Sequence, residues 1–206
     1  MKVILINGSP RKEGCTFTAL SEIEKTLREE GIETEIYQIG TDIVGCRACR
    51  ACAKIGKCVI DDKVNEFVQK AREADGFIFG SPVHYAAAGG NITSFMDRAF
   101  YSGKTAFTFK PAACILSARR AGTTAAFDQL NKYFTISQMP VISSRYWNMV
   151  HGSAPEDVLK DEEGMQTMRM LARNMAWFLK LREAGDKAGV PLPKQEEAIN
   201  FTNFIR

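Results

Sequence analysis

Four cysteines lie close together in the chain and are its most informative reactive side chains. Their spacing is C-x2-C-x2-C-x5-C, and they are Cys46, Cys49, Cys52 and Cys58. Two-residue gaps allow one tight loop to direct three thiolates at a compact centre, as in ferredoxin-type iron-sulfur sites, and the fourth cysteine completes the set. Zinc is the second interpretation and ranks below a cluster, because a structural zinc site usually has two separate C-x2-C pairs. Thiols that only pack, or that form disulfides on oxidation, are a third.

The surroundings of these cysteines are basic. Positive charge stabilises thiolates and an anionic metal cluster, and the cationic residues beside the cysteines are Arg47, Arg50, Lys54 and Lys57. Cys114 differs because it lies inside an apolar run, where it is expected to be an inert core residue. The cysteine-rich segment is therefore a candidate metal or redox centre.

A second candidate site is the glycine-bounded segment 8–16, GSPRKEGCT. It connects an apolar run to a helical pattern, and the free N–H groups of a helix N-terminus favour an anion there. Ser9 and Thr16 add hydroxyl donors, and Arg11 adds positive charge. Five residues separate the glycines and Cys15 stands where a P-loop has lysine, so nucleoside triphosphate chemistry is disfavoured. The segment also lacks the G-x-G-x-x-G spacing of a dinucleotide site, and a simple capped turn is the alternative.

Two further loops follow apolar runs, at residues 81–85 (SPVHY) and 117–124 (SARRAGTT). In an open parallel sheet, loops at the carboxyl ends of the strands converge where the strand order reverses, and ligands bind there. A proline turn, an aromatic ring and polar backbone groups can flank a flat heterocycle. His84 alone is more often a hydrogen-bonded surface residue than a catalyst. Arg119 or Arg120 can attract a cofactor phosphate, although solvated loop charges are an equally good interpretation.

The elements that position these loops alternate regularly. Short apolar runs predict five strands, at 2–7, 33–39, 76–80, 112–117 and 141–143. Helical spacing predicts a helix capped by Asp61 or Asp62, and others at 16–30, 90–100, 123–135 and about 155–184. A methionine-rich stripe between Met165 and Phe178 has the spacing of a core-facing helix edge. Right-handed crossovers then give a doubly wound parallel sheet with helices on both faces.

The segments that carry chemistry also resemble a known family. GSPRKEGCT, the cysteine loop, SPVHYAAAGGNITSFMDR and YWNMVHG are similar to the flavodoxin-like NADPH-dependent FMN reductases and, within them, to the iron-sulfur flavoproteins. The resemblance extends from Met1 to about Gly152. It implies a flavodoxin-like α/β fold with a five-stranded parallel sheet, FMN as cofactor, and one [4Fe-4S] cluster on the four clustered cysteines.

The resemblance also assigns individual residues. It implies that the FMN phosphate binds to Ser9, Arg11, Cys15 and Thr16. It places the flavin ring against Pro82, Val83, His84 and Tyr85, with Ser117, Ala118 and Gly122 opposite. Cys15 is often Asn or Ser in the family pattern, so it is expected to be a small polar filler near the phosphate. No residue need act as a nucleophile because the flavin carries the chemistry, and the candidates for ring contact are His84, Tyr85 and Trp147.

Length and charge suit one domain. The chain has 206 residues and a formal net charge of +3, and its basic residues are too dispersed for a nucleic-acid or membrane surface. We expect an FMN-binding domain at 1–185, with a cysteine-loop insertion at 45–60, and a C-terminal tail at 186–206. The apolar start of the chain is too short for a signal peptide, which favours the cytoplasm, where thiols stay reduced.

The first functional hypothesis is an NAD(P)H-dependent FMN reductase-like oxidoreductase that passes electrons to a small-molecule or protein acceptor. The alternatives are a cluster-free reductase of quinones, flavins or nitro compounds, and a redox-sensing flavin module without turnover. A homo-oligomer, dimer or tetramer, is also expected, because a cysteine loop can then lie near the flavin of a neighbouring subunit. The apolar tail offers surface for such an assembly at Phe201, Phe204 and Ile205.

Overall fold

The central sheet has five parallel strands in the order β2-β1-β3-β5-β6. The computed structural model describes residues 1–194, 196–200 and 202. The strands are β1 (Lys2–Asn7), β2 (Glu33–Gln38), β3 (Gly76–His84), β5 (Ala112–Ala118) and β6 (Met149–His151). A two-residue strand, β4 (Ala87–Ala88), pairs antiparallel with the end of β3. The doubly wound parallel sheet predicted from the sequence is confirmed.

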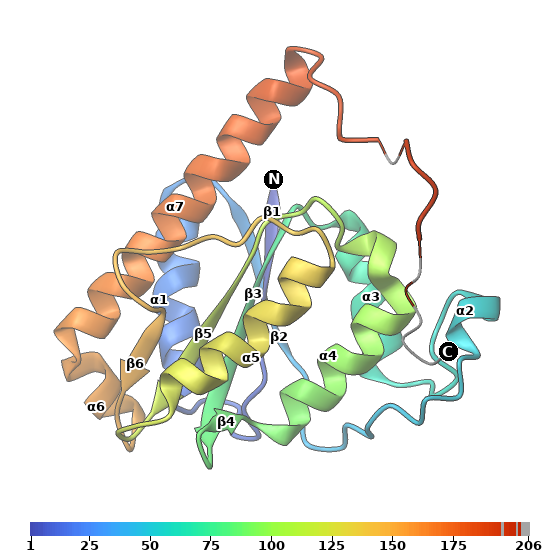
Figure 1. The fold of residues 1–206 in the computed structure, drawn as a ribbon. Coiled ribbons are helices and arrows are strands. Elements are labelled where there is room, and N and C mark those ends of the chain that lie inside the picture. Colours follow the sequence, from blue (N-terminus) through green and yellow to red (C-terminus); the bar gives the residue numbers. More distant parts are fainter. Residues whose placement is uncertain (195, 201, 203–206) are drawn as a thin grey trace.

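Helices cover both faces of this sheet (Figure 1). On one face lie α1 (Cys15–Glu29), α6 (Pro155–Lys160) and α7 (Glu162–Lys187). On the other lie α3 (Lys63–Glu73), α4 (Gly90–Gly103) and α5 (Thr123–Ile136), with the short 3-10 helix η1 (Lys104–Ala106) after α4. The four-residue helix α2 (Cys52–Ile55) stands outside α3 and α4, at the side of the molecule.

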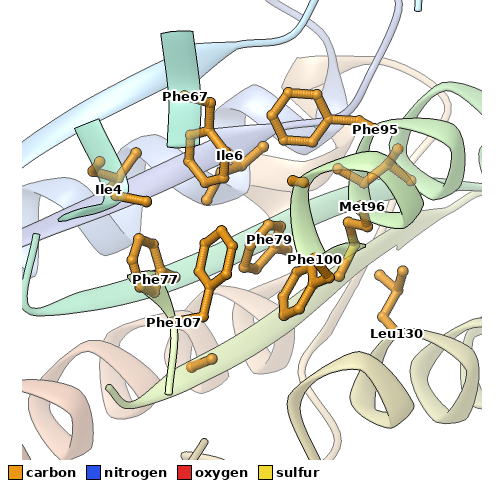
Figure 2. Close-up of a cluster of buried hydrophobic side chains, with 14 of the residues drawn as sticks. Ile4, Ile6, Phe67, Phe77, Phe79, Phe95, Met96, Phe100, Phe107 and Leu130 are labelled. Atoms are coloured by element: carbon orange, nitrogen blue, oxygen red, sulfur yellow. The ribbon is translucent and has the colours of Figure 1, made fainter. Parts of the chain in front are cut away.

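The strands divide their side chains between two cores, because successive residues of a strand point to opposite faces. Ile4 and Ile6 of β1 face α3 and α4, whereas Val3 and Leu5 face α1 and α7. Figure 2 shows the first core, which is dominated by phenylalanine. Its rings are close neighbours, and the Phe100 and Phe107 centroids lie 4.5 Å apart. This packing fixes α4 firmly against the sheet.

The last predicted strand is wrong. Val141 makes only an isolated bridge to Ala112, and the strand that pairs with the end of β5 is β6, eight residues further along. Both runs are short and apolar, so tertiary pairing rather than local propensity decides between them. The buried Asn148 favours the later run, because its side chain donates to the Cys114 carbonyl oxygen and its own carbonyl accepts from the Leu116 N–H.

The helix predicted over 155–184 is also wrong in one respect, because it is divided at Asp161 into α6 and α7. The Asp161 carboxylate accepts from the Gly164 N–H at 2.9 Å and from the His151 N–H at 2.7 Å. An acidic side chain that caps a new helix in this way begins α7 and ties it to β6. The predicted methionine stripe is confirmed, since Met165, Met168, Leu171 and Met175 are buried and Phe178 is half-buried.

Beyond α7 the described residues are exposed, from 188 to 194, 196 to 200 and at 202. Phe201, Phe204 and Ile205, expected to help an assembly form, lie outside the described residues. Within the part of the chain that the structure describes, no helix is both long and apolar enough to cross a bilayer.

Candidate functional site

A pocket of about 370 Å³ opens at the carboxyl edge of the sheet. It lies where the strand order reverses, the position at which open α/β sheets bind ligands, as flavodoxin itself illustrates. Its lining residues are Ser9, Pro10, Arg11, Cys15, Thr16, Pro82, Val83, His84, Ser117, Ala118, Arg119, Gly152 and Ser153. The structure therefore brings together all of the predicted cofactor-binding residues except Tyr85 and Gly122.

The glycine loop after β1 is held from below by two amide side chains. The buried Asn7 accepts from the Ser9 N–H at 3.1 Å and donates to the Lys12 carbonyl oxygen at 3.0 Å. Gln38, at the end of β2, accepts from Asn7 at 2.6 Å and donates to the Ser9 carbonyl oxygen at 2.8 Å. The sequence analysis missed both amides. The available signal was Asn7 itself, a polar residue directly after the apolar run 3–6.

The floor of the pocket is the N-terminus of α1. No side chain caps this helix and its first turn contains no acidic residue, so its free N–H groups and dipole favour an anion. The buried hydroxyls of Thr16 and Ser117 lie 2.8 Å apart and join α1 to β5. Gly80 allows this approach, because a Cβ atom there would lie 2.8 Å from Cγ2 of Thr16. The geometry suits a phosphate group.

Cys15 lies in the wall of the pocket and its thiol donates to the Gly152 carbonyl oxygen at 3.7 Å. Burial raises the pKa of this thiol, so it stays protonated at neutral pH. A protonated thiol is a poor nucleophile, which agrees with the expectation that Cys15 only fills space near the phosphate.

One side of the pocket is the hairpin between β3 and β4. Tyr85 and Ala86 form its turn with φ angles of 50° and 61°, the left-handed pair of a type I′ turn. This places Tyr85 at the tip, with its side chain fully exposed and outside the pocket. Gly122 lies behind the turn, where its φ of 95° and a Cβ that would stand 2.7 Å from Cα of Ala86 both require glycine. Trp147 does not line the pocket either, and its half-exposed ring packs against Tyr146.

The sequence analysis missed three lining residues, namely Pro10, Gly152 and Ser153. Two of them follow β6, so the error in placing that strand also hid the loop after it. The Gly152 N–H donates to the Ala118 carbonyl oxygen at 3.0 Å, which brings this loop to the pocket. Arg119, proposed as a contact for a cofactor phosphate, does line the pocket, whereas Arg120 does not.

The cysteine segment leaves the end of β2 and runs along α4 before it reaches α3, on the side of the molecule where α2 stands (Figure 1). Near its start, Asn91 of α4 donates to the Gly40 carbonyl oxygen at 3.1 Å. Near its end, the backbone N–H and carbonyl of Cys58 both bond to the side chain of Asn65, at 3.0 and 2.9 Å. Asp62 then caps α3 by accepting from the Val64 N–H, which confirms one of the two predicted caps.

The four clustered cysteines line one cavity, together with Arg47, Arg50 and Arg98. Cys46 and Cys49 are exposed, and Cys52 and Cys58 are half-buried. Ala48 and Arg50 adopt φ angles of 51° and 57°, left-handed conformations that tend to persist at ligand sites. The cavity is about 30 Å³, and no three Cys, His, Asp or Glu side chains among the described residues gather closely enough to hold a metal ion. The chemistry of four thiols beside three guanidinium groups suits an anionic iron-sulfur cluster.

The sheet order, the pocket at its switch point and the uncapped helix N-terminus below that pocket together define a flavodoxin-like protein. Solved structures agree on the fold. RosB with a bound formylated riboflavin phosphate intermediate gives a TM-score of 0.68 at 13% identity, over 99% of this chain and 96% of that one. A flavodoxin from Archaea gives a TM-score of 0.61 at 14% identity, over 87% and 99%.

Sequence relatives identify the family. The model of the NADPH-dependent FMN reductase family matches residues 1–154. An iron-sulfur flavoprotein of Methanocaldococcus jannaschii is 34% identical over 191 residues, which cover 88% of this chain and 98% of the relative. Another, from Methanosarcina thermophila, is 28% identical over 188 residues, which cover 88% and 96%. The chain therefore belongs to the FMN reductase family and, within it, to the iron-sulfur flavoproteins.

Proposed function

We propose that this oxidoreductase binds FMN in the pocket at the sheet edge and holds a [4Fe-4S] cluster on Cys46, Cys49, Cys52 and Cys58. The observation that carries the proposal is that one chain has a phosphate-type pocket and, along α4, a cavity walled by four cysteines and three arginines. The printed names of the relatives agree, since they are iron-sulfur flavoproteins. When bound, FMN supplies hydride acceptance and electron storage, and the cluster supplies one-electron steps.

Different residues of the pocket bind the phosphate and the ring of FMN. Ser9, Arg11 and Thr16 bind the phosphate beside the first turn of α1, and Cys15 fills the wall. The ring lies against Pro82, Val83 and His84, with Ser117 and Ala118 opposite. Tyr85 stands beyond the pocket, where it would contact only a part of the flavin that protrudes from it. A pocket that closes around a terminal phosphate and lacks an adenylate fingerprint favours FMN over FAD.

Electrons enter from NAD(P)H and leave to a small-molecule or protein acceptor. Arg119 lines the pocket and is exposed, so it can attract the phosphate of a nicotinamide nucleotide. NADH and NADPH stay equal alternatives for the donor. We also propose that the protein is cytoplasmic, because thiols stay reduced in that compartment.

The active unit is a homo-oligomer, dimer or tetramer, in which the cysteine loop of one subunit approaches the flavin of another. The pocket and the cysteine cavity share no lining residue, so they are two separate sites of one chain. Exposed apolar side chains that can be buried in an assembly include Tyr101, Ile136, Trp177 and Leu181. Mixed oligomers of cluster-free and flavin-free chains test this route: electron transfer that persists supports it, and transfer that is lost restricts electrons to one chain.

A cluster-free reductase is the second candidate, because the cysteine cavity is small as it stands. Anaerobic purification and reconstitution distinguish the two, with assays for FMN, iron and acid-labile sulfide. The proposal expects FMN together with about four iron and four sulfide per chain. Cys46→Ala should lose the iron and keep the FMN, while Cys114→Ala, at a buried cysteine remote from the loop, should keep both. FMN without iron or sulfide in the wild type supports the cluster-free reductase instead.

A further inference from the structure

A buried arginine lies beneath the cysteine segment. Arg98 belongs to the middle of α4 and is 1% exposed. An arginine has five N–H donors, and all five of this one are used. Two bind the Asp62 carboxylate, at 2.6 and 2.8 Å. The others reach the Val44 carbonyl oxygen at 3.2 Å, the Ile60 carbonyl oxygen at 3.0 Å and the Cys58 sulfur at 3.3 Å.

These five hydrogen bonds fall into two groups with different roles. The bonds to Val44, Ile60 and Asp62 tie together the two ends of the cysteine segment, and this role is structural. The remaining bond, from Nε to Sγ of Cys58, reaches the side chain of a cysteine. It directs a charged donor at one of the four sulfurs that the proposed function assigns to the cluster, and it does so from a site that water does not reach.

We propose that Arg98 is a positioning residue that fixes Cys58 toward the cavity and, through its N–H···S hydrogen bond and charge, stabilises the reduced form of a cluster held there. This inference rests on the proposed function, because it needs a cluster at the four cysteines. Hydrogen bonds to ligand sulfurs and nearby charge set the reduction potential of such centres. Both favour the form that carries more negative charge, which is the reduced form.

The guanidinium group of Arg98 carries a permanent positive charge. Its pKa is too high for it to lose a proton in proteins, so Arg98 contributes a fixed positive charge. Asp62 carries the opposite charge beside it, and its Oδ1 atom also accepts from the N–H of Val64 at the start of α3. Arg98 and Asp62 are therefore expected to act on the potential in opposite directions, the cation raising it and the carboxylate lowering it.

The test compares midpoint potentials of the reconstituted full-length protein, followed by EPR during a redox titration. Arg98→Lys keeps the charge and loses the planar fork, and should bind iron with a more negative potential than the wild type. Asp62→Asn keeps a capping oxygen and removes the opposing charge, and should move the potential in the positive direction. Arg169→Lys is the matched control, because Arg169 pairs with Glu22 at 2.6 Å on the other face of the sheet, and should change nothing.

Opposite shifts in the two variants cannot come from loosening the loop alone, which would act in one direction. Equal potentials in wild type and Arg98→Lys, with iron retained, overturn the inference and leave the proposed function intact. If Arg98→Lys does not retain iron, a potential for Asp62→Asn that is unchanged or more negative overturns it. A wild-type protein without iron or sulfide after reconstitution overturns the proposed cluster and this inference together.

Discussion

Replacing Thr16 by valine removes one hydroxyl from the floor of the proposed flavin pocket and almost no volume. Thr16 is 1% exposed and its hydroxyl lies 2.8 Å from that of Ser117, which is 5% exposed. When a phosphate binds, Ser117 can donate to Thr16 while Thr16 donates to the phosphate. Thr16→Val should then cost one charge-assisted hydrogen bond, about 1.5–3 kcal/mol, or about a 10- to 150-fold rise in the Kd of FMN.

The same change has a second consequence that does not need the ligand. The Ser117 hydroxyl is left buried without its partner, which should lower the free energy of unfolding of the FMN-free protein by about 1–3 kcal/mol. Adding Ser117→Ala should recover part of this loss but none of the FMN affinity. The two effects are therefore separable by comparing denaturant unfolding with FMN fluorescence titration.

Thr26→Val is the matched control. Thr26 lies in the same helix, is 2% exposed and donates to the Glu22 carbonyl oxygen at 3.0 Å, but it is remote from the pocket. It should change the free energy of unfolding and leave the Kd of FMN unaltered. A Kd that is the same in wild type and Thr16→Val would refute the assignment of the phosphate to the N-terminus of α1.

Three further outcomes are expected. Gly122→Ala should destabilise the protein by about 1–3 kcal/mol in thermal unfolding, because its φ is 95° and Cα of Ala86 blocks a side chain; an unchanged Tm contradicts this. Lys2 and Lys70 lower the pKa of Glu35 in the folded protein. The ionised Glu35 therefore stabilises the fold fully above the ordinary glutamate pKa of about 4.3. This stabilisation is lost as the pH falls through the lowered pKa of the folded state. Glu35→Gln should remove that part of the acid dependence, and equal acid titrations of the two proteins would contradict it. Light scattering should give at least a dimer at micromolar concentration, and a monomer excludes transfer between subunits.

The sequence was most informative where local pattern and fold agree. Buried parallel strands are short, β-branched and apolar, so β1 and β5 could be placed closely, and the loops after them followed. The last strand could not, because two short runs are locally equivalent and the buried amide of Asn148 chooses between them. That single error also hid Gly152 and Ser153 from the predicted pocket.

The side chains that hold the loops of the two sites in place could not be predicted from the spacing of residues in the sequence. Asn7 and Gln38 act only because neighbouring strands bring their side chains together. Arg98 reads as an ordinary helical arginine until the cysteine segment folds over it and supplies carbonyl, carboxylate and sulfur acceptors. Tyr85 was predicted to contact the ring, yet the left-handed turn directs it outward, so that contact stays a prediction for the loaded protein.

The central claim, that one chain holds both a flavin and a cluster, is tested most directly by an anaerobic reductive titration followed in the visible spectrum. A chain loaded with both centres should take up about three electron equivalents, two at the flavin and one at the cluster. Cys46→Ala should take up about two, all at the flavin. Uptake of only about two equivalents by the wild type after reconstitution, with bleaching of the flavin alone, would contradict the account.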